Sequence, residues 1–192
     1  MATEKKSRAW TAILYPDSLP DNWREVLDET HLQWVESPLH DRDLNADGEP
    51  KKAHYHVLVM WDGPVTYGCA EKLFHSALHG TVPQACASAR GLVRYMVHLD
   101  NPEKVQYNVQ EIKAHGGADI DELLKPTKAY TQQTLKEMTW FIVENKVTEF
   151  SDFALYCMTE QEAWFEVLTT HNTLYIKELI KSMRYKLSGA GK

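Results

Sequence analysis

Four segments in the first half of the chain are rich in β-branched and aromatic residues and end near turn signals, which predicts β-strands. They span residues 8–15, 32–39, 54–61 and 82–87, and Gly63-Pro64 is expected to end the third. Three segments with helix-capping signals are predicted to be helices, at residues 21–30, 66–79 and 88–99. The order strand, helix, strand, strand, helix, strand, helix predicts an α+β fold of the ferredoxin-like, split βαβ type. We expect an antiparallel sheet with its first and third strands central and its helices on one face.

The pattern changes after residue 101, and Gly116, Gly117 and Pro126 indicate a loop or linker. Beyond Thr127 it is helical throughout, with helices expected at residues 130–145, 148–157, 160–171 and 172–187. We therefore predict two domains, residues 1–126 with the sheet and residues 127–192 as an all-helical domain. A domain of that size has a thin core, so its many aromatic residues either fill the core or partly form a subunit interface.

His54 and His56 lie two residues apart in the third predicted strand. Alternate strand residues share a face, so the two imidazoles would lie side by side as half of a metal site. The hairpin between the second and third strands brings His40 and Asp43 near them. Three imidazoles and a carboxylate suit a divalent transition ion such as Mn²⁺, Zn²⁺, Co²⁺ or Ni²⁺, whereas Mg²⁺ would be an unusual occupant. The alternative is a solvated acidic turn in which His40 only ends a strand.

Residues 43–48 also match the first six positions of an EF-hand calcium loop. Position twelve of such a loop should be a bidentate Glu, but His54 stands there. Both neighbouring segments are predicted strands, whereas an EF-hand needs helices. The sequence therefore disfavours a calcium site.

Tyr95 lies in the predicted helix just beyond the last strand and is a candidate nucleophile. A phenol with a pKa near ~10 is a poor nucleophile at neutral pH, although a metal-bound phosphate lowers that requirement. His98, one helical turn later, would orient the phenol or accept its proton, or it is an ordinary structural residue. The alternative for Tyr95 is a packing role, as for most tyrosines.

The composition limits the class of protein but does not indicate a function. The 192-residue chain is 43% hydrophobic and 25% charged, which is typical of a soluble globular protein. It has no apolar run near the ~20 residues of a membrane span, and its three widely spaced cysteines favour a reducing, cytoplasmic setting. The net charge of −6 does not indicate a nucleic-acid binder. Local basic residues remain candidate phosphate contacts, namely Lys51, Lys52, Arg90 and Arg94.

Three ordered motifs resemble those of the HUH-endonuclease superfamily. They are Ser-Pro-Leu-His-Asp-Arg-Asp at residues 37–43, Lys-Lys-Ala-His-Tyr-His-Val-Leu at 51–58 and Tyr-Met-Val-His at 95–98. More closely, they resemble the Rep_2-type replication initiators of small rolling-circle plasmids, the RepB class. The opening segment 14–23 fits that family as well. The similarity covers residues 8–100 and extends loosely through the helical tail.

The resemblance implies the HUH endonuclease fold and a metal-dependent nickase. His54 and His56 would be the paired ligands, and His40 and Asp43 would complete a site that usually holds Mn²⁺. Tyr95 would attack one phosphodiester of single-stranded or hairpin origin DNA, giving a 5′-phosphotyrosine and a 3′-hydroxyl that primes synthesis.

The resemblance also implies partners. These are plasmid origin DNA including duplex repeats, a host helicase and polymerase, and further copies of the chain, with a hexameric ring as one form of the homo-oligomer. No membrane partner is expected. The alternatives are an HUH transposase or mobilisation relaxase, or a non-catalytic DNA-binding protein with a structural metal.

Overall fold

The computed structural model describes residues 6–189. The chain divides into two compact units between Lys125 and Pro126, whereas the sequence placed the boundary one residue later. Each unit is described by itself.

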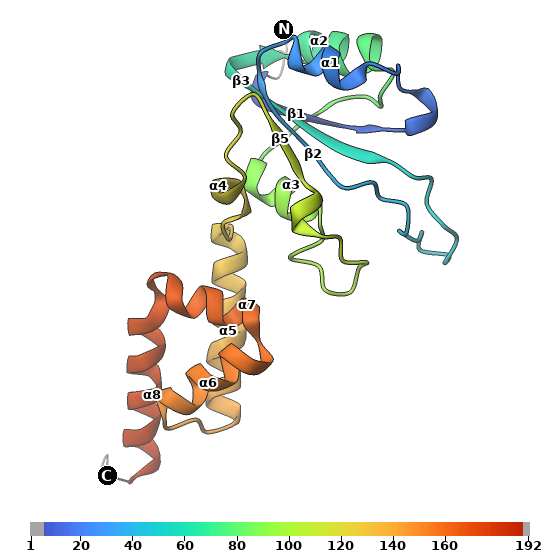
Figure 1. Ribbon diagram of the computed structural model, residues 1–192. Helices are drawn as coiled ribbons and strands as arrows, with labels where there is room; N and C mark the ends of the chain where they lie inside the picture. Colours follow the sequence, from blue (N-terminus) through green and yellow to red (C-terminus); the bar gives the residue numbers. More distant parts are fainter. Residues whose placement is uncertain (1–5, 190–192) are drawn as a thin grey trace, which may run out of the picture. The chain divides into compact units, whose positions relative to one another are not determined.

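The N-terminal unit contains a five-stranded antiparallel sheet in the order β4-β1-β3-β2-β5 (Figure 1). Its strands are β1 (Lys6–Leu14), β2 (Gln33–Glu36), β3 (Tyr55–Thr66), β4 (Gln84–Ala85) and β5 (Lys113–His115). The α+β class is confirmed, and the first and third strands are internal as predicted. The sequence missed β5, whose pairing makes β2 an internal strand too.

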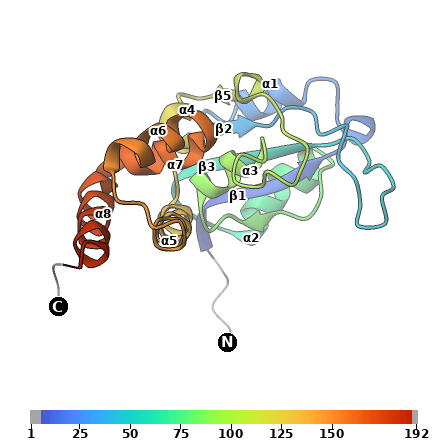
Figure 2. The ribbon, with the colours of Figure 1, turned by 90° about the horizontal axis from the view of Figure 1, so that it is seen from below.

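Helices cover both faces of this sheet (Figures 1 and 2). On one face lie α1 (Trp23–Asp28), α2 (Tyr67–Glu71) and the π-helical turn Lys72–Ala77. On the other lie α3 (Ala89–Tyr95) and α4 (Ile120–Leu124), preceded by the 3₁₀ turn Val109–Glu111; a further 3₁₀ turn, Pro16–Ser18, follows β1. The prediction of helices on one face is therefore wrong.

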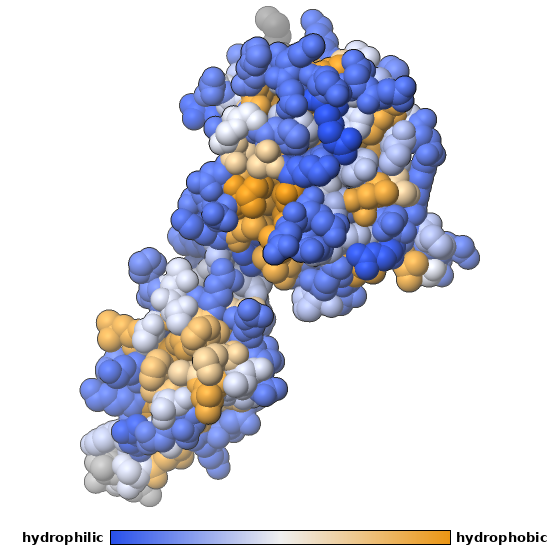
Figure 3. Space-filling model, in the orientation of Figure 1, coloured by the Kyte–Doolittle hydropathy of each residue, from blue (hydrophilic) through white to orange (hydrophobic). Residues whose placement is uncertain are grey.

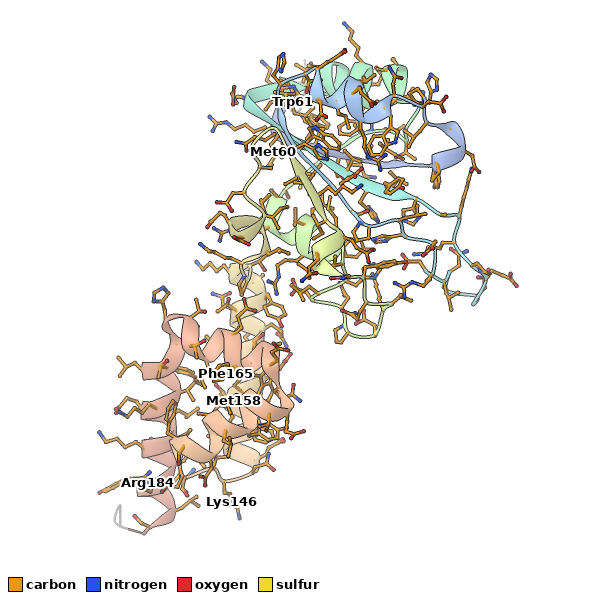
Figure 4. The ribbon with its side chains drawn as sticks, viewed as in Figure 1. Met60, Trp61, Lys146, Met158, Phe165 and Arg184 are labelled. Carbon is orange, nitrogen blue, oxygen red and sulfur yellow. The ribbon has the colours of Figure 1, made fainter. Side chains whose placement is uncertain are left out.

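The central strand β3 explains the two covered faces. Val57 and Val59 are buried in the core under α1 and α2, whereas Leu58 is buried in the separate core under α3. Farther along, Met60 and Trp61 likewise pack against different cores (Figure 4). Successive side chains of a strand point to opposite faces of the sheet. A strand whose odd and even positions are both apolar must therefore be packed against other elements on both faces.

The expected end of β3 at Gly63-Pro64 is also wrong, because the strand continues to Thr66. The pairing with β1 shifts here: Ala9 lies opposite Met60, but Ser7 lies opposite Val65. The extra residues bulge out and are exposed at 62–64, so Pro64 interrupts no continuous ladder.

The C-terminal unit is helical, as predicted. Its helices are α5 (Lys128–Glu144), α6 (Phe150–Glu160), α7 (Glu162–Val167) and α8 (Thr173–Leu187), with a π-helical turn at Leu168–Asn172. Its aromatic residues divide between two environments: Trp164 and Phe165 pack against the core, but Trp140 is 66% exposed and Tyr175 is 51% exposed. Apolar side chains therefore reach the surface of this unit (Figure 3). Within residues 6–189, no helix is long and apolar enough to span a membrane.

Two adjacent glycines next to β5 allow a matched test of the fold. Gly116 and Gly117 both have positive φ angles, +60° and +82°. A Cβ atom on Gly116 would collide with the backbone of Leu32, whereas one on Gly117 would meet nothing within 4 Å. We expect Gly117→Ala to lower the free energy of unfolding by about 1–2 kcal/mol, from backbone strain alone. Gly116→Ala should lose roughly 1–3 kcal/mol more, because overpacking is added. Urea denaturation of both variants measures this, and equal losses would contradict the close approach of Gly116 to Leu32.

Candidate active site

The three predicted histidine ligands lie together where β3 begins. His40 and His54 form an antiparallel bridge, with His40 N donating to His54 O at 2.9 Å and His54 N donating to His40 O at 3.2 Å. The ring centroids of His40, His54 and His56 are 4.8–5.3 Å apart. One potential ligand atom from each lies within 4.8 Å of the other two.

A one-residue bulge places His40 on this face. Along β2 and β3, Val35 lies opposite Leu58 and Glu36 opposite Val57, and Ser37 N donates to His56 O. If that register continued, residue 39 would face His54 and His40 would point to the opposite side of the sheet. The structure instead pairs His40 with His54, so residues 38 and 39 together oppose Tyr55. An extra residue in one strand re-aims the side chains that follow it.

Asp43 and His98 extend the cluster. The Asp43 Oδ2 atom lies 3.2 Å from His40 Nδ1 and 3.9 Å from His98 Nε2, and all three side chains are buried. These three residues form a second potential ligand group that shares His40 with the first. The sequence prediction that Asp43 returns to the histidines matches this geometry.

The hydrogen bonds of the cluster leave lone pairs facing a carboxylate. His40 Nε2 lies 2.7 Å from the Met96 carbonyl oxygen, an acceptor, so this nitrogen is the donor of that contact. When the ring is neutral, the form that burial favours, its Nδ1 faces Asp43 Oδ2 with a lone pair at 3.2 Å. His98 Nδ1 similarly faces the Val105 carbonyl at 2.7 Å, and within the described chain its buried Nε2 has no hydrogen-bond partner. Acceptors that face one another without a proton are unfavourable, and a cation between them removes the conflict. The residues present therefore fit a divalent ion.

The pKa shifts favour the deprotonated states that a metal needs. Burial lowers the pKa of His40, and burial together with the neighbouring His40 and His54 lowers the pKa of His56 to about 3. Burial by itself would raise the pKa of Asp43. The hydrogen bond from Tyr107 and the nearby imidazoles outweigh that effect, so the Asp43 pKa is lowered.

Tyr95 lies at the end of α3, beside the cluster. Its ring centroid is 5.6 Å from that of His56 and 5.1 Å from that of His98, and its side chain is half-buried. The helix begins at Ala89, directly after Ser88, the predicted N-cap, whose hydroxyl accepts from Gly91 N at 3.0 Å. The predicted extension of the helix to residue 99 is wrong, because α3 ends at Tyr95.

A left-handed residue ends α3 and directs His98 into the cluster. His98 N donates to Tyr95 O and Leu99 N donates to Arg94 O, both at 3.0 Å, which is the Schellman arrangement. The residue at its left-handed position is usually glycine, but here it is His98 with φ 57°. That conformation costs about 1–2 kcal/mol for a residue with a Cβ. This strained backbone conformation holds the His98 ring in its buried position, with Nε2 directed at Asp43.

The sequence missed two residues that complete the site, both from the segment after residue 101. Tyr107 stacks on His40, with ring centroids 4.3 Å apart, and its hydroxyl donates to Asp43 Oδ1 at 3.1 Å. Lys104 Nζ donates to the Tyr95 hydroxyl at 3.2 Å. No periodic pattern or motif marks either residue, because both lie in a long irregular loop that only the tertiary structure brings back.

Comparisons with known proteins match both units. The family described as plasmid replication protein, origin binding domain matches residues 2–121, and the family described as replication protein RepB, C-terminal matches residues 129–185. A replication protein of Staphylococcus aureus is 43% identical over 182 residues, covering 94% of this chain and 91% of its own length. Replication protein RepB of Lactiplantibacillus plantarum is 42% identical over 190 residues, covering 98% of this chain and 86% of its own.

This chain belongs to the RepB-type plasmid replication initiators. Its N-terminal unit is the origin-binding domain, and its C-terminal unit is the RepB C-terminal domain.

A cavity of about 310 Å³ opens beside the cluster in the origin-binding domain of this plasmid replication protein. It is lined by Ile13, Tyr15, Asp43, Asn45, Lys51, Lys52, His54, His56 and Tyr95. Lys51 and Lys52 therefore line this cavity, and Lys52 also pairs with Asp17 at 3.3 Å. The loop at residues 43–48 contributes Asp43 and Asn45 to the wall of this cavity. The elements on either side of it are the strands β2 and β3, as the sequence predicted, and not the helices that an EF-hand has.

The two candidate DNA contacts on α3 differ. Arg94 is 1% exposed and holds Asp100 with both carboxylate oxygens at 2.9–3.0 Å from Nε, so DNA does not reach it and the prediction is wrong. Its guanidinium stabilises the end of α3 instead. Arg90 is exposed and pairs with Glu122 of α4. A role for Arg90 at phosphate stays a prediction.

We expect the metal-free replication protein to lose stability as the pH falls from about 6.5 towards 3. The unfolded chain takes up a proton near the ordinary imidazole pKa, but folded His56 takes it up only near pH 3. Acid therefore favours the unfolded state over this range. Unfolding free energies in excess chelator at pH 7, 5 and 4 should fall less steeply for His56→Gln than for the parent. His31→Asn, an exposed control in a turn, should follow the parent. Identical slopes for His56→Gln and the parent would contradict the assignment.

Proposed function

We propose that this initiator starts rolling-circle replication by nicking one strand of plasmid origin DNA, with Tyr95 as nucleophile. The observation that carries the proposal is the position of the Tyr95 phenol, half-buried on the wall of a cavity beside a cluster of lone pairs that fits a divalent ion. The Tyr95 oxygen attacks the phosphorus atom and the 3′-oxygen leaves. The products are a 5′-phosphotyrosine and a free 3′-hydroxyl that a host polymerase extends.

His40, Asp43, His54 and His56 would hold the ion, and His98 would support Asp43 from the second ligand group. When bound, the ion would polarise the phosphoryl oxygens and offset the negative charge of the transition state. A set of nitrogen donors with one carboxylate favours Mn²⁺ or a similar transition ion over Mg²⁺. Tyr107 holds the carboxylate in place through its hydrogen bond to Asp43.

Single-stranded or hairpin DNA is the substrate that this cavity suits best. Lys51 and Lys52 supply positive charge for the phosphates at its edge. Tyr15 also lines the cavity, and its ring, which has Lys52 Nζ 4.9 Å from its centroid, would stack on an unpaired base. The net charge of −6 by itself does not favour binding of the duplex repeats.

The RepB C-terminal domain is proposed to form the homo-oligomer, with a hexameric ring as its form. Its exposed large apolar side chains support this role: Trp140, Val143, Leu155, Met158, Leu174, Tyr175, Tyr185 and Leu187. A helicase of the host would then unwind the duplex ahead of the polymerase. Among the alternatives, the match of this unit to RepB proteins favours an initiator over a transposase or relaxase. The position of Tyr95 at the cavity rather than in the core favours catalysis over a purely structural metal.

Removing only the phenol oxygen tests the nucleophile. Tyr95→Phe should abolish nicking of an origin oligonucleotide in Mn²⁺ and the covalent adduct, because no other group replaces the attacking atom. Its binding to the same oligonucleotide should stay within about twofold of the parent. Gel assays and mass spectrometry of the adduct measure both. The control Tyr67→Phe, on the opposite face of the sheet, should nick normally, and an unchanged rate in Tyr95→Phe would overturn the proposal.

Metal dependence has a readout that does not require activity. Calorimetry should show that the parent binds Mn²⁺ and that His56→Gln and His40→Gln bind it at least about tenfold more weakly, because each loses a ligand. Chelation should stop nicking and added Mn²⁺ should restore it. His79→Gln, away from the cluster, should bind like the parent. Full nicking in excess chelator would rule out the metal.

A further inference from the structure

Lys104 makes two contacts with the proposed nucleophile. Its Nζ atom donates to the Tyr95 hydroxyl at 3.2 Å and lies 4.5 Å from the centroid of the Tyr95 ring. Among the described residues, it provides the only hydrogen bond to that hydroxyl. The other close rings, those of His56 and His98, meet Tyr95 edge-on.

The loop that carries Lys104 is fixed on both sides of this residue. Lys104 N donates to the Asn101 carbonyl at 3.0 Å, and the Lys104 carbonyl accepts from Gln106 Nε2 at 3.0 Å. The next residue, Val105, accepts from the His98 ring at 2.7 Å. The Lys104 side chain is half-buried and lines a cavity with His98 and Asp43. The strained turn at His98 thus returns the chain so that Lys104 reaches the residue that ended α3.

We propose that Lys104 is a catalytic residue whose ammonium stabilises the Tyr95 phenolate, both when it attacks DNA and when it leaves. The inference rests on the proposed nicking function. In nicking, the Tyr95 O–H bond breaks and its proton goes to solvent, the bond from Oη to phosphorus forms, and the bond from phosphorus to O3′ breaks. The departing O3′ takes a proton from solvent, and Lys104 keeps its own protons throughout.

Strand joining is the reverse reaction and uses the same contact. A 3′-hydroxyl loses its proton to solvent and attacks the phosphotyrosine, and the phenolate oxygen leaves next to the Lys104 ammonium. A cation placed at an oxygen where negative charge develops lowers the barrier in both directions. The contact with Oη distinguishes Lys104 from a lysine whose role is to bind a DNA phosphate.

Substitution of Lys104 in the full chain gives the first part of the test. Lys104→Met should slow both nicking and joining of an origin oligonucleotide in Mn²⁺ by about 10²-fold, as for other single charge-stabilising donors. Lys104→Arg, which keeps the charge, should recover most of that loss. Both variants should bind Mn²⁺ as the parent does, and their circular dichroism spectra should match that of the parent. If Lys104→Met misfolds, the Arg variant and a Gln variant carry the comparison. Lys181→Met, an exposed residue of α8, should act like the parent.

A more acidic phenol separates this role from a structural one. Incorporating 3,5-difluorotyrosine at position 95 should restore at least about tenfold of the rate lost in Lys104→Met, because a stabler phenolate needs the ammonium less. The same change should not rescue Lys51→Met, whose expected defect is weaker phosphate binding. Wild-type rates in Lys104→Met, or a defect that fluorination leaves untouched, would overturn the inference while nicking stands. A parent protein that forms no Tyr95–DNA adduct would overturn both proposals.

Discussion

The pairing register between β2 and β3 is the constraint on which the site depends. Because side chains alternate along a strand, a slip of one residue would move His56 from the face of α3 to the face of α1 and α2. The apolar residues of β3 prevent that slip, since Leu58 belongs to one core and Val57 and Val59 to the other. The packing of two cores thus fixes the orientation of His54 and His56, although neither histidine belongs to either core.

The same register had to be broken once to complete the cluster. The extra residue at positions 38 and 39 turns His40 onto the face of His56, within reach of Asp43 and the Met96 carbonyl. Buried imidazoles and a carboxylate with lone pairs directed at one another are unfavourable without a cation. The structure holds them there through Tyr107 and through backbone carbonyls that fix the ring orientations. The site is therefore preorganised by the protein chain.

The end of α3 links Tyr95, the proposed nucleophile, to the rest of the cluster. A helix that continued to residue 99, as the sequence pattern suggested, would carry the following loop away from Tyr95. The left-handed conformation of His98 ends the helix and points the ring at Asp43, and it returns the loop with Lys104 and Tyr107 over the site. One strained residue therefore directs its own ring and the loop that follows it towards the cluster, which is consistent with strain concentrated at a functional site.

The sequence by itself determined the α+β class, the helical second unit, and the candidate residues His40, Asp43, His54, His56 and Tyr95, because strand periodicity, caps and motif spacing are local. It also identified Lys51 and Lys52, which line the cavity. Only the tertiary structure decided that helices cover both faces, that β5 adds to β2, and that Arg94 is buried with Asp100. The sequence likewise did not indicate the bulge before His40 or the loop that brings Lys104 and Tyr107 to the site. The second covered face, β5, the bulge and the Tyr107 contact depend on residues far apart in the chain, where no local pattern records which partner a side chain will meet. The contacts of Arg94 and Lys104 depend on where α3 ends, which the local pattern placed four residues too late.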